Sequence, residues 1–227
     1  MHNKFNVHNL LSLEEEEIAE LVKEFCLPPI CYMTSSGHGW NTGGKRSFDG
    51  SLRENQFNSI VEGKISVLCH MLRDKGLVIE THQLATEHDD VPLWERCKRE
   101  NEIFDEFKNT HLVLGHAIHA DAFSKPSANG TTTFHFKGSS AAFFGDVMQD
   151  SLIQAHQLRN RGVKTANFKI LRDTKAHWIL TEAAFMTNPR EKELLKSDGF
   201  RNINAVASVN AVLETAVLHY KRFVSWE

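Results

Sequence analysis

Two histidines and one glutamate, His38, Glu54 and His119, are the side chains of this 227-residue chain best suited to metal chemistry. His38 lies in a Gly-His-Gly turn, whose glycines allow a sharp bend and a close approach of the backbone to a ligand. Glu54 falls in the first turn of an expected helix, where the helix dipole favours a carboxylate. His119 ends an apolar run that we expect to be a strand. Two imidazoles and a carboxylate are a ligand set of hydrolytic zinc sites, which keep a fourth position for water.

Another histidine, His116, lies three residues before His119. Residues three apart in a strand point to opposite faces, so these two imidazoles cannot reach one ion from regular β structure. His119 is the better ligand because it lies nearer the carboxyl end of the strand, and we expect His116 to be packed or hydrogen-bonded. The three candidate ligands are far apart in sequence and make no local zinc signature, so the prediction depends on the fold.

The elements that must position these residues follow from apolar periodicity and turn residues. We expect helices over about 12–26, 53–75, 94–108, 139–160 and 201–224, and strands over about 30–34, 77–81, 111–119, 131–137, 168–171 and 178–182. Ser12 and Glu15 are expected to form a capping box at the start of the first helix.

This alternation of strands and helices predicts an α/β fold, with a central twisted, mostly parallel sheet of about six strands flanked by helices. The strand over 131–137 follows the preceding strand without an intervening helix, so one antiparallel neighbour is expected. In such sheets ligands bind beyond the carboxyl ends of the strands, which is where His38, His119 and Glu182 fall.

Composition and charge exclude several classes of function. The chain is 41% hydrophobic and 24% charged, which suits one domain with a substantial core. A formal net charge of -3 offers no basic surface, so we expect no nucleic-acid partner. The four cysteines contain no CxxC pair, and we expect free, mostly buried thiols. No run of 18 apolar residues occurs, so no membrane insertion is expected.

Six sequence blocks occur in an order that is typical of one enzyme family. They are Ser-Gly-His-Gly at 36–39, Leu-Arg-Glu-Asn-Gln-Phe-Asn at 52–58, Leu-Arg-Asp-Lys-Gly-Leu-Val-Ile-Glu-Thr at 72–81, Ala-Ile-His-Ala-Asp at 117–121, Lys-Ile-Leu-Arg-Asp-Thr at 169–174 and Leu-Thr-Glu-Ala-Ala-Phe-Met-Thr-Asn at 180–188. With these blocks the chain, from about Ile30 to Tyr220, resembles the zinc-dependent N-acetylmuramoyl-L-alanine amidase family.

The resemblance implies hydrolysis of the amide between the muramic acid lactyl group and the first L-alanine of the stem peptide of bacterial peptidoglycan. It implies that His38, Glu54 and His119 hold one Zn²⁺ ion and that Glu182 is the catalytic carboxylate. We therefore expect an N-terminal helical extension at 1–28 and a single amidase catalytic domain at 29–227.

Three positions depart from the family pattern, one of which is a proline usually found before the last strand and replaced near His177. Ser35 stands where the family usually has Asp, and Asp121 stands where it usually has Asn. None of these changes removes a ligand or Glu182, but those at Ser35 and Asp121 could alter the hydrogen bonds that orient the ligands.

Glu182 follows Trp178 and Leu180 by strand alternation, which places all three on one face of the sheet. The expected role of Glu182 is to take a proton from the attacking water and deliver it to the leaving amine. A structural role as a helix cap is the alternative for this residue.

Candidate substrate-binding residues come from two regions. Arg172 is one, with a surface ion pair as an equally good alternative. Asn41, together with Lys45 and Arg46 in the loop after His38, could meet carboxylates of the stem peptide.

Other functions and the biological setting stay open. A different zinc peptidase or amidase on the same scaffold, and a noncatalytic wall-binding module, are the alternatives. The amino terminus shows no basic n-region, long apolar region or cleavage site, so we expect synthesis in the cytoplasm without a signal peptide and action on the cell wall after release. A phage endolysin used for host cell lysis, with a holin-type release partner, fits this expectation, and a mother-cell autolysin is the alternative.

Related enzymes carry an active-site-occluding helix as an insertion near the middle of the chain. Here the stretch at 123–131 is too short to hold one, so we expect an open cleft.

Overall fold

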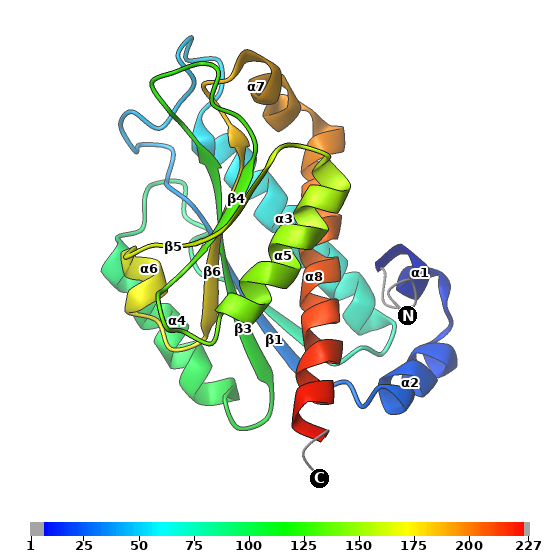
Figure 1. Cartoon of the computed structure of the whole chain (residues 1–227). Helices are drawn as coiled ribbons and strands as arrows, with labels where there is room; N and C mark the ends of the chain where they lie inside the picture. The colour runs from blue at the N-terminus through cyan, green and yellow to red at the C-terminus, as the bar shows by residue number, and fades with distance from the viewer. Residues whose placement is uncertain (1–6, 225–227) are drawn as a thin grey trace.

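A six-stranded sheet forms the centre of the structure, a computed structural model that describes residues 7–224 (Figure 1). The strands are β1 (Ile30–Ser36), β2 (Ile79–Gln83), β3 (Leu112–Asp121), β4 (Thr131–His135), β5 (Asn160–Thr165) and β6 (His177–Phe185), in the order β2-β1-β3-β6-β4-β5. Only β4 and β6 pair antiparallel among these strands, and the other four pairings are parallel. The predicted α/β fold with a mostly parallel sheet and one antiparallel pairing is confirmed.

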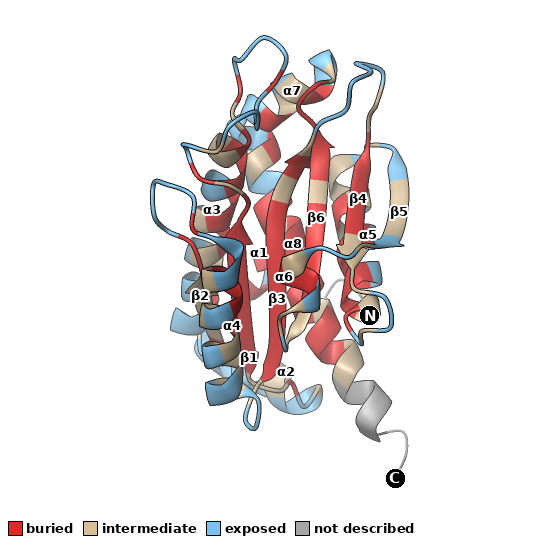
Figure 2. Ribbon diagram, turned by 90° about the vertical axis from the view of Figure 1, so that its left-hand side faces the viewer, coloured by how far each residue is buried: buried red, intermediate tan, exposed pale blue. Residues whose placement is uncertain are grey.

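Helices cover both faces of this sheet. They are α1 (Val7–Ser12), α2 (Glu15–Glu24), α3 (Glu54–Asp74), α4 (Leu93–Phe107), α5 (Ala142–His156), α6 (Lys169–Arg172), α7 (Pro189–Lys196) and α8 (Asp198–Val224). Helices α3, α5 and α8 lie on one face, while α4 and α6 lie in front of the other face in Figure 2. Strands enclosed in this way are apolar over most of their length, as β1 and β3 are.

The two faces of the sheet have separate hydrophobic clusters. The larger one joins α3, α5 and α8 to side chains such as Leu114 and Ile118 of β3. The smaller one lies under α4 and α6 and contains Trp178 and Leu180 of β6. Trp178 lies directly over Gly115, where an added Cβ would come 1.2 Å from the indole ring. Because side chains alternate along a strand, those of β6 point in turn into the two clusters. The same alternation determines which side chains of neighbouring strands share a face near the site.

The first two helices belong to the larger cluster. Val7, Leu10 and Ile18 are buried in it, and the Val7 amide donates a 2.7 Å hydrogen bond to Asn210 Oδ1 on α8. The predicted capping box of Ser12 and Glu15 is wrong: Glu14 and Glu17 form the box of α2, while Ser12 ends α1 and donates to the carbonyl of Asn9.

The described residues leave out 1–6 of the predicted extension and 225–227 of the predicted catalytic domain. The first residues of the amino-terminal segment, for which no signal peptide is expected, are among those left out. The division at residue 28 stays a prediction. Within 7–224, no helix has the length and apolar character needed to cross a membrane. The cysteines are free thiols, and all but Cys26 are buried, as expected.

Several elements differ from the sequence expectation. The strand predicted at 168–171 is the short helix α6, while the helix predicted at 139–160 ends at His156 and is followed by β5, which was not predicted. Short apolar runs do not distinguish a strand from a buried helical turn, so periodicity failed at Phe168–Leu171. Helix α5 stops because Gln157 takes a left-handed conformation with φ 53°, after which the chain turns into β5. Helix α7 was not predicted, although Asn188 and Pro189 give it a regular N-cap and first position.

Candidate active site

The carboxyl ends of β1, β3 and β6 meet at one edge of the sheet, because these three strands are parallel neighbours. His38 follows the end of β1, His119 lies near the end of β3, and Glu54 is the first residue of α3. The fold therefore brings the three predicted ligands to one place, although they span some eighty positions of sequence.

Glu54 lies between the two imidazoles. Its Oε1 is 2.8 Å from His119 Nδ1 and its Oε2 is 3.4 Å from His38 Nε2. The two rings meet edge to face, with centroids 5.1 Å apart. One possible ligand atom from each residue lies within 4.8 Å of the others, so the three side chains could hold one metal ion.

The loop that carries His38 is held by the helix that carries Glu54. Asn58 Nδ2 donates to the Gly37 carbonyl at 2.8 Å, and Asn55 Nδ2 donates to the His38 carbonyl at 2.9 Å. His38 has φ 62°, a left-handed conformation that such support must stabilise. Gly37 is required for a different reason, because an added Cβ there would lie 2.1 Å from His119 Cε1.

The protonation states of His38 and Glu54 suit metal binding. Burial lowers the pKa of His38 to about 4, so its imidazole is neutral near pH 7. Burial alone would raise the pKa of Glu54, but the hydrogen bond from His119 and the positive charges around the carboxyl, including Lys45, leave that pKa below its ordinary value. A neutral imidazole and an ionised carboxylate are the forms that coordinate a metal.

Glu182 lies on β6 directly beside His119 of β3 in the strand register. Its Oε2 is buried and makes no hydrogen bond. Burial, and then the negative charges of Glu54 and Asp121, raise the pKa of Glu182 well above its ordinary value. A carboxyl group with a raised pKa beside a metal-binding group is suited to exchanging protons with a reactant. The helix after β6 is capped by Asn188, so the cap alternative for Glu182 is wrong.

His116 is buried and hydrogen-bonded, as predicted. Its Nδ1 lies 2.8 Å from Tyr32 Oη and its Nε2 lies 2.7 Å from Thr181 Oγ1. Burial lowers its pKa to about 3, so it stays neutral inside the larger cluster. Both ring nitrogens are used structurally.

The two candidate substrate-binding residues lie in different surroundings. Asn41 lies in the exposed loop after His38, where its Oδ1 accepts a 2.8 Å hydrogen bond from the Asp90 amide. Arg172 lies on α6 and pairs with Asp173, with Nε 2.7 Å from Oδ1, and with Asn167. The structure thus shows the ion pair that was the alternative for Arg172, and none of its hydrogen bonds reaches the metal group.

Two buried charged residues near the site were not singled out from the sequence. Arg96 of α4 donates from Nη1 to Ser35 Oγ and to the Ser36 carbonyl, and Glu62 of α3 accepts from the Ser36 amide at 3.1 Å. They fix the end of β1 just before the His38 loop. Glu62 falls on the apolar stripe of α3, at helical spacing from Ile65. A carboxylate on an apolar stripe was the signal that could have identified it.

The loop from 122 to 130, between β3 and β4, contains no helix. The backbone amide of Phe123 in this loop donates to Thr187 Oγ1 at 3.0 Å. Asn188, at the start of α7, donates from Nδ2 to the loop carbonyls of Pro126 and Ala128. No helical insertion in this described segment covers the metal group.

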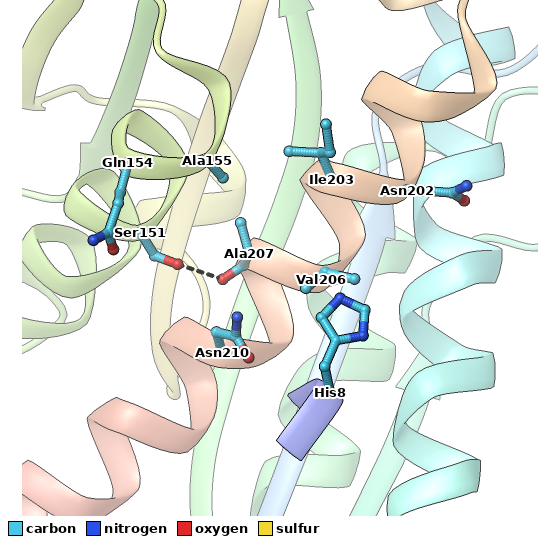
Figure 3. Close-up of a pocket in the computed structure, with 9 residues that line it drawn as sticks. All are labelled: His8, Ser151, Gln154, Ala155, Asn202, Ile203, Val206, Ala207 and Asn210. Carbon is cyan, nitrogen blue, oxygen red and sulfur yellow. Dashed lines mark hydrogen bonds between the residues drawn. The ribbon is translucent and has the colours of Figure 1, made fainter. Parts of the chain in front are cut away.

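A pocket of about 490 Å³ opens elsewhere, between α5 and α8 (Figure 3). Its lining includes His8, Asn202 and Asn210, and the hydroxyl of Ser151 donates to the Ala207 carbonyl at 2.8 Å.

Curated proteins similar to this chain include cell wall amidases. N-acetylmuramoyl-L-alanine amidase CwlM of Bacillus licheniformis is 31% identical over 96 residues, which is 42% of this chain and 34% of that protein. The probable cell wall amidase LytH of Staphylococcus aureus is 29% identical over 96 residues, 42% of this chain and 33% of that protein. The matched segment thus spans about a third of the length of these relatives.

Solved structures share the fold over most of the chain. The catalytic domain of the amidase CwlV from Bacillus (Paenibacillus) polymyxa var. colistinus superposes with a TM-score of 0.71 at 23% identity, covering 82% of this chain and 97% of that one. An N-acetylmuramoyl-L-alanine amidase from Clostridium difficile 630 gives a TM-score of 0.72 at 21% identity, covering 83% and 97%.

The family model described as N-acetylmuramoyl-L-alanine amidase (Amidase_3) matches residues 33–214. This range contains the metal group and Glu182, and it covers most of the sheet. The chain therefore belongs to the N-acetylmuramoyl-L-alanine amidase family.

Proposed function

We propose that this chain hydrolyses the amide bond between N-acetylmuramic acid and L-alanine in bacterial peptidoglycan. The observation that carries the proposal is the His38–Glu54–His119 group with Glu182 in register beside His119 on the next strand. Family membership and the amidase names of the similar proteins support the same substrate.

The three ligands suit one Zn²⁺ ion. Two imidazoles and a carboxylate are a zinc ligand set that leaves a fourth position for water, and the Glu54 carboxylate contacts both rings at 2.8 and 3.4 Å. When bound, zinc lowers the pKa of its water toward about 7 and polarises the scissile carbonyl. Asn55 and Asn58 hold the His38 loop in the position that the ligand set needs.

Glu182 performs the proton transfers. Its carboxylate accepts a proton from the attacking water, and its raised pKa favours retention of that proton until the amine of L-alanine leaves. The leaving amine then takes the proton from Glu182. A bound cation would counteract the rise in the pKa that burial causes, which keeps Glu182 ionised before the attack.

The test is digestion of purified peptidoglycan by the zinc-loaded chain, with mass analysis of the fragments. The proposal expects free L-alanine amino termini with the glycan chains left intact, and no new L-alanine amino termini with Glu182→Gln, which should retain its bound zinc. Cleavage between stem residues would instead support a different zinc peptidase on the same scaffold. Tight wall binding without any cleavage would support a noncatalytic module, and full activity of Glu182→Gln would remove that residue from the mechanism.

For the biological setting, we propose that the chain acts as a phage endolysin in host cell lysis, with a holin-type release partner. A mother-cell autolysin is the alternative, and the bacterial cell wall amidases among the similar proteins favour keeping it. The neighbouring genes decide between them: an adjacent gene for a small hydrophobic protein supports the first setting, and a sporulation operon supports the second.

A further inference from the structure

The strand register continues the row of site residues across the sheet. Thr132 of β4 lies opposite Glu182, which lies beside His119. In the next row, Phe134 of β4 lies between Leu180 of β6 and Lys164 of β5. Cα partners point to the same face of a sheet, so Phe134 and Lys164 share the face of Glu182.

Helices α4 and α6 cover the lower part of this face, where Leu180 is buried and Phe134 packs against the smaller cluster. In Figure 2, α4 and α6 lie in front of the lower part of the sheet, and the upper parts of β3, β6 and β4 have no helix in front of them. The side chain exposures agree: Phe134 and Glu182 are half-buried and Lys164 is exposed. Phe168, the N-cap of α6, is 44% exposed and packs edge to face on Phe134 with centroids 5.6 Å apart.

Two cationic side chains lie on β5, one of them Lys164, the register partner of Phe134. The charges of Arg161 and Lys164, both on β5, act on the Asp121 carboxylate at the end of β3. Arg161 places its guanidinium 4.9 Å from the centre of the Phe185 ring and donates from Nη1 to the Asn129 carbonyl, which leaves Nε buried without a partner. Lys164 makes no ion pair among the contacts of the described residues and lies in the open.

We propose that Phe134, Phe168 and Lys164, named here the β5 shelf, bind the stem peptide of the substrate, with Lys164 pairing to a stem-peptide carboxylate. This inference rests on the proposed amidase function and assigns the shelf to the peptide side of the scissile bond. The glycan side offers no carboxylate, because the lactyl carboxyl is consumed in the scissile amide, so a cation beside apolar rings suits the peptide better.

The dimensions suit an extended peptide. Two strand spacings and one pair of residues separate the backbones of Glu182 and Lys164, which is roughly 12 Å. An extended peptide rises about 3.3–3.6 Å per residue, so a carboxylate two or three residues from the scissile amide comes within reach of the flexible Lys164 side chain. Phe134 lies on the strand between Glu182 and Lys164, and Phe168 packs on it, so the two phenyl rings offer apolar contact to the peptide.

The experiment uses soluble muropeptides that carry the stem carboxylates either free or converted to carboxamides. The wild-type chain is expected to show a KM about 5- to 10-fold lower for the free acid, with similar kcat, because one exposed charge pair contributes about 1 kcal/mol. Lys164→Gln should lose this preference, with kcat unchanged. Phe168→Ala should raise KM for both substrates and keep the preference.

Lys98→Gln is the matched control, since Lys98 is an exposed lysine on α4. It should keep the wild-type KM for both substrates. A wild-type chain that cleaves both muropeptides with equal KM, or a Lys164→Gln variant that keeps the preference, would overturn the shelf and leave the amidase function intact. No cleavage of either muropeptide would overturn the proposed function and this inference with it. Equal thermal midpoints of the variants verify folding.

Discussion

The Arg96 guanidinium donates a 2.8 Å hydrogen bond to Ser35 Oγ, at the position where the family pattern has an aspartate. The carboxylates around Arg96 come from other elements: Asp90 Oδ1 lies 2.9 Å from Nη2, and Glu62 acts on it electrostatically from α3. Helices α3 and α4 are thus joined through the end of β1, directly before the His38 loop. This chain keeps a buried ionic cluster without the acid that the family pattern places there.

Replacing Arg96 with Met should destabilise the fold by about 3–5 kcal/mol, because it leaves the buried Glu62 carboxylate without a counter-charge. Arg96→Lys should fall between Met and wild type, since a lysine restores the charge but not the several directed hydrogen bonds. Urea unfolding measures both. Arg73→Gln, which breaks an exposed pair with Glu80, is the control and should cost under about 1 kcal/mol. Equal stabilities for the Arg96 and Arg73 variants would show that the cluster is unimportant.

Glu54→Ala should release the metal. The substitution removes the carboxylate that contacts both imidazoles, and two histidines alone are a weaker ligand set than the full site. Elemental analysis after dialysis should find bound zinc far below one ion per chain. Glu16→Ala, at an exposed position on α2, should keep the wild-type content. Unchanged zinc in Glu54→Ala would exclude this residue from the ligand set.

Gly37→Ala should impair the site by crowding. The new methyl group would lie 2.1 Å from His119 Cε1, so the imidazole must move away from Glu54. We expect a stability loss of about 1–3 kcal/mol from overpacking and a clear drop in zinc affinity. Gly43→Ala is the matched control, because an added Cβ there meets nothing within 4 Å. The same zinc affinity in the two variants would contradict this account of the loop.

His156 should make the fold sensitive to acid. Burial lowers its pKa to about 4, against an ordinary value of 6.5, so the folded state favours the neutral ring. Its contribution is fully present above about pH 6.5 and is lost as the pH falls toward 4, because the unfolded chain binds the proton first. At pH 4.5 the loss is about 2–3 kcal/mol. His156→Gln should show a smaller fall in unfolding free energy between pH 7 and pH 4.5, and an identical fall would refute the prediction.

The chain should act without an activator. The loop from 122 to 130 contains no helix that could occlude the metal group, so the purified, zinc-loaded chain should reach its full rate on peptidoglycan alone. Rates measured with and without added host or wall extract test this. A strict dependence on a second protein would show that another segment closes the site.

The grouping of His38, Glu54 and His119 was predictable because each lies near or just after a strand end or opens a helix, and strand ends meet at one edge in a parallel sheet. The preference for His119 over His116 followed from strand alternation and from its place nearer the carboxyl end of the strand, which is β3 in the structure. Other features needed the tertiary structure. Periodicity cannot assign an apolar run as short as 168–171 to a strand or a helix. Because β5 was not predicted, the pairing of Lys164 with Phe134 could not be predicted either. The contact between Arg96 and Ser35 depends on how α4 packs and has no local signature.

The hydrogen bond from the Val7 amide to Asn210 joins α1 to α8. Both helices pack on the larger cluster, on the face of the sheet opposite to Glu182. In Figure 1, α2 lies toward the end of the molecule where α8 finishes, α1 lies beside α8, and α7 lies at the opposite end from α2. A module fused before α1 would therefore attach beside α8, on the side of the sheet away from Glu182. If the proposed function holds, added domains at α1 or α8 would leave the group of His38, Glu54 and His119 uncovered.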